Sequence, residues 1–288
     1  MRSMIVAAVL LAFGLATSAQ QARRGQAAGA PSPWKFNPTQ RSVGDGGPAP
    51  KRDLTGTWAG PGSGAGVSQF AEGEQSTEEP SLTPLGKQMM SDRKPLRPYG
   101  PAGTNDPHVR YCDPLGFPQN MLREIRGVSF ATMPDRVIVL IQYMDNWREI
   151  WTDGRALPAN VGASGPNVPN PRLNGYSVGR WEDDYNFVVD TTGMDERTWL
   201  TAGGYPHTPN ARVRERYTRV SKNELKLAIT IEDPAVYTKP FSLGSVTFRW
   251  VPNQQIDEWI CMPSDVQEYL KLMGDPAGSD PEAEKRGR

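Results

Sequence analysis

The stretch that decides the fold is residues 211–232, which reads ARVRERYTRVSKNELKLAITIE. Two alternating segments, 211–220 and 224–232, flank the turn-forming tripeptide Ser221-Lys222-Asn223. In the second segment apolar side chains occupy every second position, which places them on one face of an extended chain. They are Leu225, Leu227, Ile229 and Ile231. The pattern predicts a β-hairpin that buries one face and exposes the other.

The first segment of this hairpin carries charge on both faces. Val213, Glu215 and Tyr217 share one face, and arginines at 212, 214 and 216 share the other. If the apolar members point inward, the Glu215 carboxylate points inward with them, which is costly unless it is paired or protonated. We therefore expect Glu215 to pair with an arginine or to lie at a hydrated end of the fold. We expect the arginines to form a solvated outer face, with an anion-binding groove as the alternative.

Alternating segments of this kind recur along most of the chain. The others are residues 53–58, 127–133, 136–144, 147–152, 176–182, 185–191, 241–251 and 256–262. Two helices are predicted, one beginning at Thr83-Pro84, where Thr is a good cap and Pro suits the first turn, and one over 264–273. Strands joined mainly by short loops predict a mostly β fold, an antiparallel lipocalin-like barrel of about 8–10 strands with one or two short helices. A β-sandwich is the alternative.

The charge balance and the distribution of apolar residues argue against several classes of protein. The chain has 32 Lys and Arg against 32 Asp and Glu, so its formal net charge is zero, which argues against a general nucleic-acid binder. No apolar run reaches the roughly 20 residues of a membrane-spanning helix. The expected partner is therefore a small molecule, and no cofactor is predicted.

The N-terminal segment is typical of an exported protein. Arg2 precedes a short apolar run, and small residues follow up to Ala19, so residues 1–19 are predicted to be a signal peptide cleaved near Ala19. The mature protein would then be periplasmic or secreted. Residues 20–52 are predicted to be a flexible tether, 53–273 a single β domain and 274–288 a flexible tail.

The chain has two cysteines, Cys112 and Cys261. In an oxidising compartment an even number of cysteines favours a disulfide, with two separate buried thiols as the alternative. Closing so long a loop stabilises a protein by about 4–5 kcal/mol in chain-entropy models. Two thiolates this far apart lack the spacing of a zinc site.

Aromatic residues on the alternating segments predict a ligand cavity inside the barrel. Trp147, Glu149 and Trp151 share a face, which we expect to point inward. A barrel of this size can hold one small ligand between aromatic walls and a few polar anchors. The candidate walls are Trp147, Trp151, Tyr217 and Trp250, and the candidate anchors are Glu149, Glu215 and His207. The first functional hypothesis is therefore the binding of a small, partly apolar or aromatic molecule.

Two alternative functions belong to other classes. The barrel could be an acid–base enzyme of the isomerase or lyase type, in which Glu215 or His207 moves a proton. His207 lies in a Gly- and Pro-rich loop, 203–209, of the kind that often carries function. The chain has only two histidines, so a His-rich centre is excluded, and no metal site is predicted. The third hypothesis is a structural envelope protein whose barrel is filled.

Several motifs resemble those of a widespread group of secreted bacterial proteins of unknown function. They are Leu82-Thr-Pro-Leu-Gly86, Asn105-Asp-Pro107, Cys112-Asp-Pro-Leu-Gly-Phe-Pro118, Asp153-Gly-Arg155, Ser177-Val-Gly-Arg-Trp-Glu182, Val188-Val-Asp-Thr191, Glu215-Arg-Tyr217, and Asp233-Pro234 with Tyr237-Thr-Lys-Pro240. This resemblance brings no established catalytic residue. The opening Gly56-Thr-Trp58 also resembles the start of lipocalin-type barrels. That likeness implies that Trp58 closes one end of the barrel beneath an arginine of a late strand, for which Arg249 is the candidate.

Overall fold

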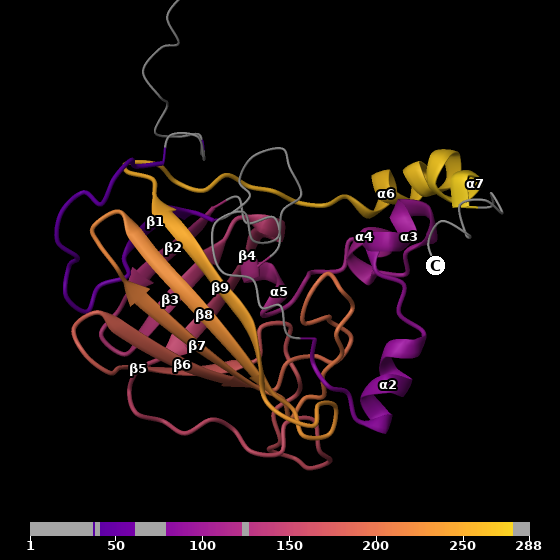
Figure 1. Ribbon diagram of the computed structural model, residues 1–288, viewed down its shortest axis with the longest axis horizontal. Coiled ribbons are helices and arrows are strands. Elements are labelled where there is room, and N and C mark those ends of the chain that lie inside the picture. The colour runs from indigo at the N-terminus through magenta and orange to yellow at the C-terminus, as the bar shows by residue number, and fades with distance from the viewer. Residues whose placement is uncertain (1–36, 38–40, 61–78, 123–126, 279–288) are drawn as a thin grey trace, which may run out of the picture.

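The computed structural model describes residues 37, 41–60, 79–122 and 127–278. Nine strands form one closed barrel in sequence order, and β1 also pairs with β9 (Figure 1). The strands are β1 Gly56–Ala59, β2 Val128–Thr132, β3 Arg136–Ile141, β4 Asn146–Trp151, β5 Tyr176–Trp181, β6 Asn186–Thr192, β7 Arg212–Arg219, β8 Glu224–Glu232 and β9 Phe241–Trp250. The prediction of a mostly β, lipocalin-like barrel is confirmed, and the sandwich alternative is wrong.

The hairpin of β7 and β8 has the facing that its sequence predicts. Glu215 pairs across the strands with Ile229, and Tyr217 pairs with Leu227. Burial alternates strictly along β7, where the apolar members and Glu215 point inward and the arginines at 212, 214 and 216 are exposed. A charged side chain is thus buried because the period of the strand carries it inward with its apolar neighbours.

One pair of neighbouring strands breaks the antiparallel pattern. Strands β4 and β5 run parallel, and their register covers only Ile150 with Ser177 and Trp151 with Val178. Parallel neighbours need a crossover connection, which is the long segment 152–175. The first four residues of β4 therefore lie outside this short register.

Large side chains pack into one apolar cluster inside the barrel. Trp58, Phe187, Tyr217 and Phe248 are all fully buried there. The packing is tight at Gly179, where an added Cβ would lie only 2.4 Å from Cζ of Phe187. These side chains occupy the interior positions where the sequence predicts a ligand cavity.

Trp58 is fully buried and lies beneath an arginine, as the Gly-x-Trp start implies, but the arginine is not the expected one. Cζ of Arg219 lies 4.3 Å from the centroid of the Trp58 ring, and the indole Nε1 donates to the Leu54 carbonyl at 3.1 Å. Burial lowers the pKa of Arg219 to about 10. Arg249 instead pairs with Glu224 at 2.8 Å. The assignment of Arg249 is wrong because Arg219, at the end of an inward-facing series, already covers the indole.

Short helices gather beside the barrel, and the first matches its prediction. Helix α2 spans Pro84–Ser91, and Oγ1 of its cap residue Thr83 accepts a hydrogen bond from the Gly86 amide at 3.1 Å. The sequence did not predict α3 Leu96–Gly103, α4 Pro107–Tyr111 or α5 Gln119–Leu122. A 3-10 turn, Tyr143–Asp145, joins β3 to β4. The second predicted helix begins as α6 Pro263–Tyr269 and continues as a π-helical turn Leu270–Gly274 and α7 Asp275–Gly278.

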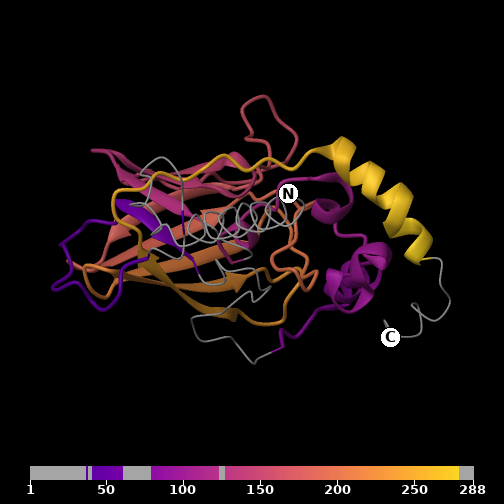
Figure 2. The ribbon, with the colours of Figure 1, turned by 90° about the horizontal axis from the view of Figure 1, so that it is seen from above.

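The prediction of a tenth strand over residues 256–262 is wrong. This segment is irregular, because β9 already pairs with β8 on one side and β1 on the other. After β9 the chain runs along the barrel to α6 and α7, which lie next to α3 and α4 (Figures 1 and 2). Two aligned strand neighbours leave no place for a third.

A disulfide fastens this C-terminal segment to the helices. Cys112, which follows α4, is bonded to Cys261, as predicted, with 5.5 Å between their Cα atoms. The attachment also includes an ion pair between Arg110 Nη1 and Asp275 Oδ1 at 2.7 Å. The bond encloses strands β2 to β9 in one covalent loop.

The predicted signal peptide and most of the predicted tether lie outside the described residues. Residue 37 and residues 41–52 of the tether are described, and the stretch 41–52 runs against the barrel. The amide of Ser42 donates to the Trp250 carbonyl at 2.8 Å, and the amide of Asn223 donates to the Asp45 carbonyl at 2.9 Å. No helix within the described ranges is long and apolar enough to cross a bilayer.

Candidate functional site

A groove of about 800 Å³ lies where β4 and β5 separate. One wall is β4 with the segment that follows it, and the other is residues 171–178, which lead into β5. The walls include three aromatic side chains and four arginines: Trp147, Trp151 and Tyr176, with Arg148, Arg155, Arg172 and Arg197. The groove exists because the parallel register of β4 and β5 is only two residue pairs long.

The groove lies on the outer side of β4, so the predicted facing of this strand is wrong. Arg148 and Ile150 are the buried residues of β4, and Trp147, Glu149 and Trp151 alternate with them on the outer face. The Trp147 side chain is 59% exposed. The apolar members of a strand normally choose the inward face, but here Arg148 turns inward to meet Glu215.

The two outward tryptophans differ in what covers them. The Trp151 ring lies between two guanidinium groups, with Cζ of Arg136 at 3.9 Å and Cζ of Arg155 at 3.4 Å from its centroid. Arg136 in turn donates to Glu149 Oε1 at 2.9 Å. Such contacts use the faces of the ring, so Trp151 presents mainly its edge to the groove, whereas Trp147 is open.

A chain of amide side chains fixes the two walls to each other. Asn120 Nδ2 donates to Asn174 Oδ1 at 2.7 Å, and Asn174 Nδ2 donates to Asn146 Oδ1 at 2.8 Å. The same Asn174 nitrogen donates to the Trp147 carbonyl at 2.9 Å. Residues 146–149 of β4 have no register with β5, and these side-chain bonds join the two walls there instead. They also hold the backbone of Trp147 in place.

Two of the groove arginines are held by a carboxylate close in sequence. Arg155 binds Asp153 through Nε and Nη2, and Arg197 binds Asp195 in the same manner. In each pair the guanidinium keeps the pKa of the carboxyl below its usual value. The Asp153-Gly154-Arg155 motif is thus a turn with a local ion pair.

Behind the groove, a buried ion pair crosses the barrel from β4 to β7. Arg148 Nη1 donates to Glu215 Oε1 at 2.8 Å, and Nη2 donates to Oε2 at 2.9 Å. Nη2 also contacts Oγ of Ser177 at 2.7 Å and Oγ1 of Thr191 at 2.9 Å. The expectation that Glu215 pairs with an arginine is confirmed, and removing one partner of such a pair is strongly destabilising.

The predicted wall residue Tyr217 belongs to this interior cluster. Its hydroxyl donates to Glu215 Oε1 at 3.0 Å. Burial, reinforced by the Glu215 carboxylate, raises the pKa of Tyr217 well above its ordinary value. Trp250, the other predicted wall, is half-buried against the core beside Trp58. Neither residue lines the groove.

His207 is a buried residue that bonds within the connection between β6 and β7. Its Nε2 lies 3.1 Å from Thr198 Oγ1 and its Nδ1 lies 3.2 Å from the Thr208 carbonyl. Burial lowers the pKa of His207. Neither His207 nor Glu215 lines the groove or the two cavities described next, so their proposed role in proton transfer stays a prediction.

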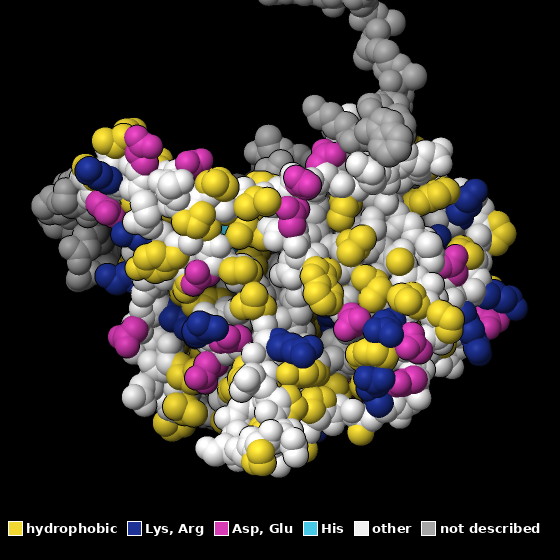
Figure 3. Space-filling model, turned by 180° about the vertical axis from the view of Figure 1, so that it is seen from behind, with side chains coloured by type: hydrophobic (Ala, Val, Ile, Leu, Met, Phe, Trp, Pro, Cys, Tyr) yellow, Lys and Arg dark blue, Asp and Glu magenta, His cyan; other side chains and the backbone are white. Residues whose placement is uncertain are grey.

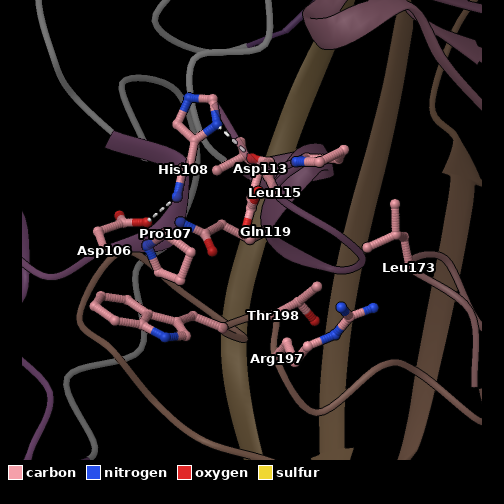
Figure 4. A pocket seen from close by; sticks show the side chains of 11 residues that line it. Asp106, Pro107, His108, Asp113, Leu115, Gln119, Leu173, Arg197 and Thr198 are labelled. Carbon is pink, nitrogen blue, oxygen red and sulfur yellow. Dashed lines mark hydrogen bonds between the residues drawn. The ribbon is translucent and has the colours of Figure 1, made fainter. Parts of the chain in front are cut away.

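A smaller cavity of about 210 Å³ adjoins the groove and shares Leu173 and Arg197 with it. His108 contributes to its wall, and the two bonds drawn in Figure 4 run from its Nδ1 to the Asp113 carbonyl and from its backbone amide to Asp106 Oδ1. Sequence reasoning missed this cavity. The available signal was that Asp106 and Asp113 belong to the motifs Asn105-Asp-Pro107 and Cys112-Asp-Pro-Leu-Gly-Phe-Pro118.

A third cavity, of about 570 Å³, lies over the outer face of β6, β7 and β8. Arg214 there donates to Asp190 Oδ1 at 2.8 Å, and Arg216 pairs with Glu182. The arginine series is therefore largely an outer face with ion pairs. Acidic and basic side chains also lie next to each other on the opposite face of the molecule, which Figure 3 shows from behind. Among the described residues no three His, Cys, Asp or Glu side chains gather as metal ligands.

The Cys112–Cys261 disulfide and the closed barrel do not by themselves assign an activity. Comparison of the chain with protein-family models, with curated proteins and with solved structures finds no match.

Proposed function

We propose that this protein is an exported β-barrel protein that binds a small, partly apolar or aromatic molecule in the groove between β4 and β5. The observation that carries the proposal is the open Trp147 side chain in a groove of about 800 Å³. That volume lies within the range of about 300–1,000 Å³ that is typical of ligand sites. The ligand site thus moves from the interior of the barrel to its outer wall.

The surroundings of Trp147 support a binding role for its ring. An indole offers a large, rigid contact area at a small cost in conformational entropy. The backbone beside Trp147 is held by Asn174 and Asn146. Leu140, which pairs with Trp147 on β3, is also exposed and extends the apolar surface. Because the site is already ordered before the ligand binds, little conformational entropy is lost on binding.

Export belongs to the same proposal, as does membership of the secreted bacterial group. A disulfide persists in oxidising compartments, and the structure contains one between Cys112 and Cys261. The N-terminal residues 1–19 carry the pattern of a signal peptide.

A structural role is the second candidate, and the filled interior of the barrel favours it. The two functions predict different results for small molecules retained by the purified protein. Mass spectrometry of protein released from its own envelope fraction should identify a retained molecule, and calorimetric titration should then give its affinity. A purely structural protein retains no molecule.

The variant Trp147→Ala tests whether the ligand binds in this groove, and Tyr269→Ala is the matched control. Both side chains are about half exposed, but Tyr269 lies on α6 and outside the groove. We expect Trp147→Ala to weaken binding at least tenfold without changing the melting temperature, and Tyr269→Ala to bind like the parent protein. Equal affinity for all three proteins would place the ligand elsewhere.

A further inference from the structure

We infer that the molecule bound in the groove is an aromatic carboxylate, and that Arg172 binds its carboxylate group. This inference rests on the proposed function and specifies the ligand of the same site. It starts from the charges that line the groove, continues with the position of Arg172 and ends with the open indole of Trp147.

Arg172 differs from the other arginines of the groove wall. Arg148 is paired with Glu215, Arg155 with Asp153 and Arg197 with Asp195. Among the described residues, no carboxylate forms an ion pair with Arg172. Arg172 is therefore the groove guanidinium whose charge has no counterion within the described part of the chain.

The backbone of Arg172 is firmly placed. Its amide donates to the Gly193 carbonyl at 3.0 Å, and its carbonyl accepts from the amides of Gly175 at 3.0 Å and Asp195 at 2.9 Å. Three backbone bonds thus fix the start of this side chain relative to β6. The Cα atom of Arg172 is therefore held at one position in the groove wall. A fixed backbone favours a specific contact between its side chain and a ligand.

The guanidinium of Arg172 is also oriented. Its Cζ lies 4.6 Å from the centroid of the Tyr176 ring, and the Tyr176 hydroxyl donates to the Asn170 carbonyl at 2.8 Å. The ring contact uses the face of the planar guanidinium. The N–H groups point outward at its edge, where they can bind a carboxylate through two parallel hydrogen bonds. The Arg172 side chain is exposed and lines the groove, so its N–H donors can meet a carboxylate there while the contact with the Tyr176 ring is kept.

The apolar part of the ligand is indicated by the two tryptophans. Trp151 has Arg136 and Arg155 against its ring, whereas Trp147 is open. Trp147 and Arg172 line the same groove from opposite walls. An aromatic carboxylate can stack its ring on Trp147 and bind Arg172 through its carboxylate. A neutral arene would make only the first contact, and a simple inorganic anion only the second.

The test compares 2-naphthoate with its uncharged analogue naphthalene-2-carboxamide, by calorimetric titration of the full chain at low salt. We expect the parent protein to bind 2-naphthoate at least tenfold more tightly than the carboxamide. Arg172→Gln should abolish this preference and leave the carboxamide affinity within about twofold, because the side chain is exposed and forms no ion pair with another described residue. Arg180→Gln, on β5 and outside the groove, should keep the preference.

The outcomes separate the inference from the proposed function on which it rests. If both probes bind equally and both need Trp147, the groove is a binding site but the carboxylate assignment is wrong. A preference for 2-naphthoate that survives Arg172→Gln overturns the role of Arg172. If neither probe binds in a manner that depends on Trp147, both the proposed function and this inference are rejected. Circular dichroism and the melting temperature of each variant confirm that it is folded.

Discussion

The buried ion pair between Arg148 and Glu215 allows a sharp prediction about stability. In Glu215→Gln the shape of the side chain is kept while its charge is removed. The Arg148 side chain is only 1% exposed and that of Glu215 is 0% exposed, so water cannot replace the missing charge. The carboxylate accepts three hydrogen bonds, two from Arg148 and one from the Tyr217 hydroxyl, and in the Gln side chain an NH2 group replaces one of the accepting oxygens.

The expected loss follows from these contacts. Breaking a buried pair by removing one partner costs about 3–5 kcal/mol, because an uncompensated charge stays in the interior. For a domain of this size that loss lowers the melting temperature by roughly 6–20 °C. Urea unfolding followed by tryptophan fluorescence measures the free energy, and scanning calorimetry measures the melting temperature.

The control is Glu182→Gln, which breaks the ion pair with Arg216 on the outer face. Both of those side chains are partly exposed, so the expected loss is below about 1 kcal/mol. A double variant, Arg148→Met with Glu215→Leu, removes both buried charges and should be more stable than Glu215→Gln alone. The reasoning is refuted if Glu215→Gln costs no more than Glu182→Gln, or if the double variant is the less stable of the two.

Three further predictions concern the disulfide, the packing of the barrel and pH. Replacing Cys112 and Cys261 by serine should lower the free energy of unfolding by up to about 5 kcal/mol, because the bond closes a loop of 149 residues, and an unchanged guanidinium midpoint would contradict this. Gly179→Ala should cost about 1–3 kcal/mol in urea unfolding, since the new Cβ would clash with Phe187, and a neutral effect would show that the interior has spare room. Burial lowers the pKa of His207 below its ordinary value of 6.5, so the unfolded chain binds the proton more readily and stability should fall as the pH drops below about 6.5. Unfolding at pH 7.5 and 5.0 should show a smaller pH effect in His207→Gln than in the parent protein, and equal effects would assign the pH dependence to other groups.

Local patterns predicted several elements because the physics behind them is local. Thr83 followed by proline marks the start of α2, since both residues suit the first turn of a helix. The alternation along 224–232 predicts which side chains of β8 are buried. Helices α3, α4 and α5 were missed because they are short and depend on packing more than on an apolar period.

The direction in which the side chains of β4 point could not be predicted from such a local pattern. Alternation separates Trp147, Glu149 and Trp151 from Arg148 and Ile150, but it does not say which set points inward. The two tryptophans suggested that their own set points inward. In the structure Arg148 points inward instead, because it binds the buried carboxylate of Glu215, which lies 67 positions along the chain. A buried charge needs its partner, and this requirement outweighs the burial of two indoles that can be covered by arginines or left at a groove.

The sequence by itself determined the β class of this protein, the inward position of Glu215, the cap of α2 and the pair of cysteines available for a disulfide. Each of these depends on the period of a strand, on a helix terminus or on the number of cysteines. Only the tertiary structure decided that β4 and β5 run parallel over two residue pairs, that Trp147 lies open beside them, and that Arg172 has no ion-pair partner among the described residues. These features depend on which distant strands become neighbours, and a one-dimensional pattern carries no information on that choice.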